Sequence, residues 1–106
     1  MASRLNEEAV MPKGYWIVHI KVTVPEIYRR YADVAPAIVS RLGGTYTVDA
    51  GRAECAEGDA SLDRHVVVEF PSYDAALAAF RSEAYQAVVD LRRASSDCSF
   101  TIAEGA

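Results

Sequence analysis

The sequence predicts an α+β domain built on one antiparallel sheet of four strands. Two patterns support this prediction. Apolar residues recur at every second position in four short segments, and at every third or fourth position in the segments that separate them. Taken in chain order, these segments read β-α-β-β-α-β.

Strands are expected at residues 15–22, 45–55, 64–70 and 98–102. The first is the clearest, because every even-numbered residue from 16 to 22 is apolar while the other side includes a histidine and a lysine. In the second, strict alternation would place Tyr46 and Val48 on one face and Thr47 and Asp49 on the other.

The first predicted helix covers residues 25–42 and ends at a Gly-Gly pair, which is typical of a helix C-terminus. Thr23 and Glu26 have the spacing of a capping box at its start. Pro36 lies inside this helix and removes one backbone hydrogen bond, so a kink is expected there.

Ser72 and Ser82 are expected to cap two further helical segments, 73–80 and 83–94. Short connections in the order βαββαβ predict the ferredoxin-like arrangement, in which the helices cover one face of the sheet. The wholly apolar sides of the strands should therefore lie beneath the helices.

Length and composition exclude several classes of protein. With 106 residues the chain predicts a single domain, residues 11–106, preceded by a polar extension of ten residues. A net charge of −4 argues against nucleic-acid binding, and no apolar run is long enough to span a membrane. The start lacks the pattern of a signal peptide, and two isolated cysteines suggest reduced thiols, so a cytoplasmic location is expected.

The open face of the predicted sheet is half apolar, which is unusual for a surface in contact with water. Sheet faces of this kind commonly pack against a second sheet. A homodimer formed through the open face is therefore predicted. The residues expected on this face include Tyr15, Ile17, His19, Thr47, His65, Val67 and Glu69.

Several stretches resemble the family known as domain of unknown function 1330, within the dimeric α/β-barrel superfamily. They are "MPKGYWIVHIKVTVPEIYRRYADVAPAIVSRLGG", "VVVEFPSYDAALAAFRSEAYQAVVDLRR" and the closing "TIAEG". The resemblance covers roughly residues 11–105 and implies the same fold and a dimer, but no defined reaction. Relatives in the superfamily include cofactor-independent monooxygenases and isomerases that use a pocket beside the sheet for flat organic molecules.

The sequence departs from the family pattern at two places. Val24 stands where the resemblance implies Asp, and Asp49-Ala50 replaces what is often a basic residue followed by Gly. If that basic residue binds an acidic substrate in relatives, this protein would not share the ligand.

Two residues of the open face are candidates for chemistry. His19 could act as a general base, with Glu69 orienting its ring or serving as a second acid/base group. The simpler interpretation is that both histidines lie in an interface and are satisfied by hydrogen bonds. No metal site is expected, because His65 and Glu69 are about 13 Å apart along one strand at roughly 3.3 Å per residue.

A second candidate site lies on the helix side of the sheet. Tyrosines at positions that face the core could either pack as ordinary aromatic residues or line a pocket with Tyr28 and Tyr85 at its polar rim. Arg92 is a further candidate contact, although the simpler expectation is that its side chain extends to water.

Two functions follow from these observations. The first is a small-molecule enzyme or binding protein that carries out acid/base chemistry on a small carbonyl or aromatic compound, without an organic cofactor. The alternative is a non-catalytic homodimeric module that binds a ligand or has a structural role. The two differ in whether His19 and Glu69 face a cavity or the partner subunit.

Overall fold

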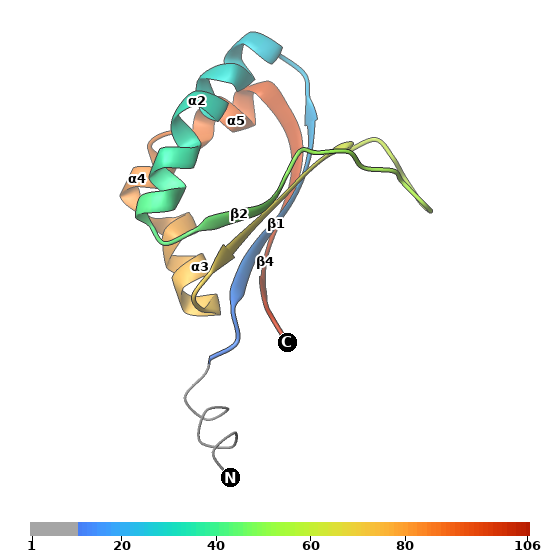
Figure 1. Cartoon of the computed structure of the whole chain (residues 1–106). Helices are drawn as coiled ribbons and strands as arrows, with labels where there is room; N and C mark the ends of the chain where they lie inside the picture. The colour runs from blue at the N-terminus through green and yellow to red at the C-terminus, as the bar shows by residue number, and fades with distance from the viewer. Residues whose placement is uncertain (1–10) are drawn as a thin grey trace.

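Four strands form a single antiparallel sheet in the order β2-β3-β1-β4, in a computed structural model that describes residues 11–106 (Figure 1). The predicted N-terminal extension, residues 1–10, lies outside the described residues. The strands are β1 (Gly14–Val22), β2 (Thr45–Asp49), β3 (Arg64–Phe70) and β4 (Ser96–Glu104). This order, with β1 and β3 in the centre, confirms the ferredoxin-like fold.

The four helices within residues 11–106 cover the same face of the sheet, and none of them covers the opposite, open face (Figure 1). They are α2 (Pro25–Arg41), α3 (Tyr73–Arg81), α4 (Glu83–Gln86) and α5 (Val89–Ser95). The single segment predicted at 83–94 is therefore divided into α4 and α5.

The helix starts were predicted with mixed success. Ser72 and Ser82 cap α3 and α4 as expected, since each hydroxyl oxygen accepts a hydrogen bond from a backbone N–H three residues ahead. The predicted capping box of α2 is wrong. Val24 is its N-cap without a side-chain bond, and the Thr23 backbone N–H donates to the Ser95 carbonyl oxygen at 2.8 Å.

Trp16, the third residue of β1, is the centre of the core. Its ring centroid lies 4.9 Å from that of Phe70, 4.8 Å from that of Tyr85 and 5.2 Å from that of Phe100. The indole N–H donates to the Ala76 carbonyl oxygen of α3 at 2.8 Å. This bond satisfies a polar group that would otherwise be costly to bury, and it fixes α3 over the sheet.

A β-bulge in β2 changes which residues face the helices. Tyr46 pairs with Val68, but Val48 pairs with Val67 and Asp49 with Val66, so Thr47 is the extra residue. The predicted alternation is therefore wrong beyond Tyr46. Val48 lies on the open face with 43% of its surface exposed, whereas Asp49 turns to the helix side.

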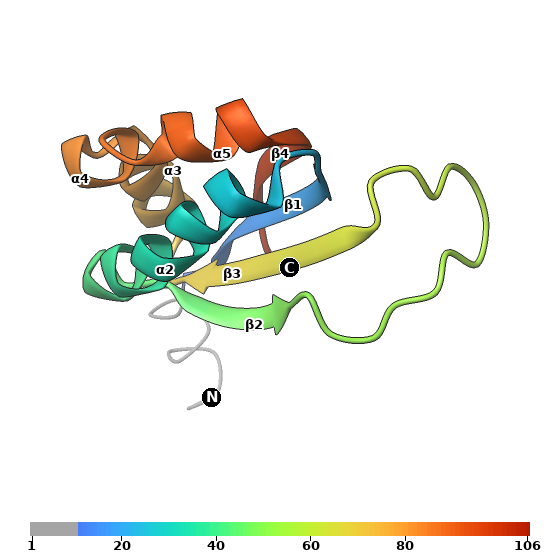
Figure 2. The ribbon, with the colours of Figure 1, turned by 90° about the horizontal axis from the view of Figure 1, so that it is seen from above.

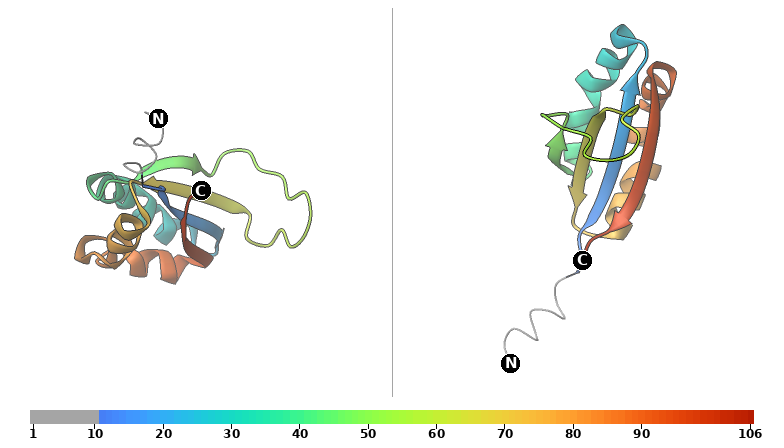
Figure 3. Two further views of the ribbon diagram at one scale, coloured as in Figure 1. Left: turned by 90° about the horizontal axis from the view of Figure 1, so that it is seen from below. Right: turned by 90° about the vertical axis from the view of Figure 1, so that its right-hand side faces the viewer.

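The strand also ends earlier than expected, at Asp49 rather than Cys55. Ala50 follows with a φ of 56°, and its N–H donates to the His65 carbonyl oxygen at 2.9 Å. Residues 50–63 then form a long loop that projects away from the sheet (Figures 2 and 3).

Candidate functional site

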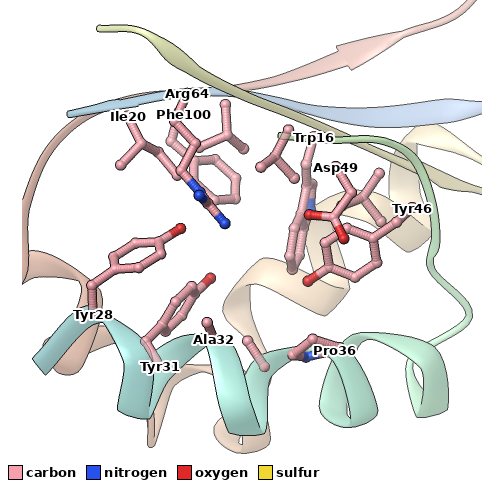
Figure 4. Close-up of a pocket in the computed structure, with 14 residues that line it drawn as sticks. Trp16, Ile20, Tyr28, Tyr31, Ala32, Pro36, Tyr46, Asp49, Arg64 and Phe100 are labelled. Atoms are coloured by element: carbon pink, nitrogen blue, oxygen red, sulfur yellow. The ribbon is translucent and has the colours of Figure 1, made fainter. Parts of the chain in front are cut away.

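A pocket of about 130 Å³ lies between α2 and the sheet (Figure 4). Its floor is apolar and comes from the sheet, with Trp16, Val18, Ile20, Val66, Val68 and Phe100. Helix α2 forms the opposite wall through Tyr28, Tyr31, Ala32, Ala35 and Pro36. These residues meet because the even-numbered side of β1 and the apolar stripe of α2 both face the core.

Arg64, at the start of β3, places a positive charge in this apolar pocket. Its register opposite Ile20 directs the side chain to the helix side of the sheet. The guanidinium carbon lies 5.2 Å from the centre of the Tyr28 ring, within the range of a cation–π contact. Its Nε atom is buried and has no hydrogen-bond partner among the residues that the structure describes.

The hydroxyl groups of Tyr28 and Tyr31 point toward the same space as the Arg64 guanidinium (Figure 4). Burial raises the pKa of Tyr28, although the positive charge of Arg64 partly opposes this shift. Burial and the neighbouring Tyr85 raise the pKa of Tyr31 far above its usual value. Both phenols are therefore neutral hydrogen-bonding groups at physiological pH.

Asp49 and Tyr46 line another side of the pocket (Figure 4). The bulge at Thr47 brings Asp49 to this position, where its carboxylate lies on the exposed rim. Burial raises the pKa of Tyr46, and the neighbouring Tyr85 and Asp49 add to this shift. The pocket thus has an apolar floor, a basic side chain that projects into the cavity and an acidic side chain on its rim.

Tyr85 and Arg92 lie behind the pocket. The Tyr85 hydroxyl is 2.6 Å from that of Tyr31, and the Arg92 Nε donates to Tyr85 at 3.4 Å. Tyr85 is fully buried and does not line the pocket, so of the two predicted rim tyrosines only Tyr28 does. The expectation that Arg92 extends to water is wrong, because only 5% of its surface is exposed and its guanidinium lies over the Phe100 ring.

On the open face, the hydrogen-bonded pairs of side chains differ from the expected pair of His19 and Glu69. His19 lies opposite His65 with their Nδ1 atoms 2.8 Å apart, so one ring donates and the other accepts. Glu69 lies opposite Tyr15 and accepts a hydrogen bond from its hydroxyl at 3.2 Å. Burial and this bond raise the pKa of Tyr15.

His19 and Glu69 therefore do not contact each other. The register places Glu69 four residues along β3 from His65, the partner of His19. Ile17 and Val67 lie between the two pairs and are also opposite each other, as expected for this face. The expected His19–Glu69 interaction is thus replaced by two separate polar pairs with apolar residues between them.

The structure consequently divides the predicted site residues between the two faces of the sheet. Tyr28, Tyr85 and Arg92 lie on the helix side. Thr47 is the bulge residue at the sheet edge, where its hydroxyl donates to the Val67 carbonyl oxygen at 3.2 Å. The open face carries the remaining ones, Tyr15, Ile17, His19, His65, Val67 and Glu69.

A larger hollow of about 570 Å³ lies between the histidine pair and the loop of residues 50–63. Most of its lining belongs to that loop and includes four carboxylates, those of Glu54, Glu57, Asp59 and Asp63. Hydrogen bonds from Ser61 lower the pKa of Asp59. A surface of this kind suits an apolar or acidic ligand less well than the aromatic pocket does.

Among residues 11–106, no three His, Cys, Asp or Glu side chains lie close enough together to hold a metal ion. In the same part of the chain, the helices lack the length and apolar character that crossing a bilayer would require.

Sequence reasoning overlooked Arg64 and Asp49, the two charged residues of the pocket. A signal for Arg64 was present, because it shares its side of the strand with Val66 and Val68, and a charged residue on an apolar face is unusual. The family resemblance drew attention to the position of Asp49, but strict alternation placed this residue on the open face. Its true direction depends on a bulge that strict alternation does not reveal.

Comparison with known proteins identifies the family of the chain. The family model of the domain of unknown function DUF1330 matches residues 13–106. The chain belongs to the DUF1330 family. None of the curated proteins matches this DUF1330 chain in sequence.

Solved structures show the same fold. RPA0582, a protein of unknown function from Rhodopseudomonas palustris, has a TM-score of 0.70 and 18% identity, over 99% of this DUF1330 chain and 92% of its own. The methylated form of RPA0582 has a TM-score of 0.71 and 17% sequence identity, and the match covers 99% of this chain and 90% of that protein. SnoaB, a cofactor-independent oxygenase from Streptomyces nogalater, has a TM-score of 0.60 and 15% identity. This match covers 87% of this chain and 91% of SnoaB. Similarity at this level of identity establishes the fold alone.

Proposed function

We propose that this protein binds a small, partly apolar carbonyl or aromatic compound in the pocket between α2 and the sheet, and carries out acid/base chemistry on it without an organic cofactor. The observation that supports this most directly is the buried, unpartnered Nε of Arg64 in an aromatic pocket. Pockets that combine apolar walls with a few converging polar groups are typical ligand sites. The distant likeness to a cofactor-independent oxygenase is consistent with this class of function but does not establish it.

In the proposed reaction, Asp49 is the base. Its carboxylate accepts a proton from an O–H or an acidic C–H of the bound compound, and the electron pair stays on the compound as a phenolate or enolate. Arg64, whose guanidinium projects into the same pocket, offsets the negative charge that develops. The neutral phenols of Tyr28 and Tyr31 donate hydrogen bonds to the same oxygen.

The alternative function, a non-catalytic homodimeric module, is supported by a different observation. On the open face His19 is engaged by His65 and Glu69 by Tyr15, as expected of side chains that hold a surface in place. We propose that this face packs against a second copy of the chain, with Ile17, Val67 and Val48 as its apolar centre. The pocket and this contact use opposite faces of the sheet, so a dimer is compatible with either function. A cytoplasmic location also remains a proposal.

The binding site can be tested with two leucine substitutions on one helix. Ala35 faces the pocket and Ala37 faces solvent, both on α2. In a thermal-shift screen of small aromatic and keto acids, Ala35→Leu should abolish stabilisation by any ligand found, because the larger side chain fills the pocket. Ala37→Leu should leave it unchanged. Binding that survives Ala35→Leu would contradict the proposed site.

Once a substrate is found, substitutions on the two faces of the sheet can show which face carries the catalytic residues. Asp49→Asn should lower turnover strongly while leaving the fold intact. His19→Ala and Glu69→Gln, on the open face, should have little effect. If the open-face variants lose turnover and Asp49→Asn does not, the chemistry belongs to the open face and the proposed role of Asp49 is wrong.

A further inference from the structure

The floor and the mouth of the pocket differ in polarity and exposure, and this difference restricts which ligands can bind. Its floor is fully apolar, with Trp16 and Val68 at most 2% exposed. Its mouth is marked by exposed residues, Ala32 and Pro36 of α2 together with Asp49. A ligand that fits should therefore rest an apolar part on this floor and direct a polar group toward the charged side chains of the pocket.

Arg64 is the only basic residue that lines the pocket within the described part of the chain. Its Nε lacks a partner, and no carboxylate lies within ion-pair distance of its guanidinium among residues 11–106. Figure 4 shows the guanidinium projecting into the cavity between the tyrosines of α2 and the aromatic residues of the sheet. A buried donor without a partner is costly, so a bound acceptor would be stabilised at this place.

We infer that the pocket binds single-ring aromatic acids as their anions, with the Arg64 guanidinium as the partner of the ligand carboxylate. The inference rests on the proposed function and specifies its ligand class. A carboxylate is the acceptor that matches the planar donor fork of arginine, and the resulting charge-assisted bonds are about twice as strong as neutral ones.

The size of the pocket limits the ligand to one ring. Its volume of about 130 Å³ is close to that of an engineered apolar cavity, about 150 Å³, which accepts one benzene molecule. The aromatic walls, Trp16 and Tyr31 among them, favour a flat ring that can stack or meet them edge to face. Two fused rings would require the walls to move apart.

Asp49 modulates this preference through its charge. As the acidic residue on the rim, it repels an anion held at Arg64. The charges of Arg64 and Asp49 should therefore have opposite effects on the affinity for the same anion. Removing the positive charge should weaken the binding of an anion, and removing the negative charge should strengthen it.

Trp16 provides the readout, because it is the only tryptophan of the chain and lines the pocket. Titrations of its fluorescence with benzoate and with the uncharged analogue benzamide would be compared at pH 7, where a carboxylic acid is ionised. Benzoate should bind about tenfold more tightly or better. Arg64→Gln should remove this difference, and Asp49→Asn should tighten benzoate by about fivefold.

Arg41→Gln is the matched control, since Arg41 lies exposed in the last turn of α2. It should leave both affinities unchanged. Should Arg64→Gln fail to fold, the wild-type comparison of benzoate with benzamide still decides the inference. Equal affinities would overturn the choice of an anion but leave the proposed function standing, because a neutral ring would still occupy the pocket. If neither compound alters the fluorescence of Trp16 at millimolar concentration, the inferred ligand class and the proposed function are both overturned.

Discussion

At the scale of single residues, Ala50 holds the most unusual backbone conformation among the described non-glycine residues. Its φ of 56° lies in the left-handed region, which costs an ordinary L-residue about 1–2 kcal/mol. It follows Asp49 directly, so the strain lies where the chain leaves β2 beside the pocket. The family resemblance places Gly at this position, and Gly adopts such a φ without steric cost.

Ala50→Gly should therefore stabilise the protein. The gain in the free energy of unfolding should be about 0.5–1 kcal/mol, which is the relief of strain less the entropic cost of a glycine. Urea denaturation would measure it. Ala53→Gly, in the same exposed loop but at an ordinary φ, is the control and should be neutral or destabilising by up to about 1 kcal/mol. Equal effects of the two substitutions would show that Ala50 is not strained.

At the scale of elements, close packing of β1 against the start of α3 depends on a glycine. A Cβ atom built on Gly14 would overlap the carbonyl group of Ser72, the residue that caps α3. The obstacle is backbone, which cannot rotate away as a side chain can. Gly14 is thus required for the sheet and this helix to meet as they do.

Gly14→Ala should lower the free energy of unfolding by about 1–3 kcal/mol, which is the usual cost of overpacking. Gly51→Ala is a suitable comparison, because a Cβ there meets no atom within 4 Å and its φ is not positive. That variant should be neutral or slightly stabilising. Chemical denaturation of both variants would test the difference, and a fully stable Gly14→Ala would refute the close approach.

At the scale of the whole molecule, no helix within residues 11–106 covers the open face of the sheet (Figure 3). The apolar centre of this face is flanked by two hydrogen-bonded pairs, Tyr15–Glu69 and His19–His65. The two pairs satisfy polar groups of this face before water is removed from it. This is the physical basis for expecting a second copy of the chain to cover it.

Light scattering coupled to size exclusion should give twice the chain mass of 11.5 kDa at micromolar concentration. Val67→Lys should shift the protein to the monomer mass, because a charge would have to be buried in the contact. Val34→Lys, on the exposed side of α2, should remain dimeric. A wild-type protein with the monomer mass would contradict the dimer.

The sequence by itself determined the elements of this protein and their order. Alternation in β1, the apolar stripe of α2, and the serines that cap α3 and α4 are local patterns, and each was visible within a window of a few residues. Local patterns persist in the fold because burial rewards the same periodicity that the backbone imposes. The order of the elements then left few topologies to consider.

Only the tertiary structure decided what the site consists of. Hydrogen bonds between β2 and β3 place a bulge at Thr47 and so turn Asp49 into the pocket. The register between β1 and β3 pairs His19 with His65 and leaves Glu69 to Tyr15. Arg64 becomes part of the pocket because α2, far away in sequence, closes over it. These outcomes depend on contacts between distant segments, and a shift of one residue in strand pairing exchanges the two faces of a sheet.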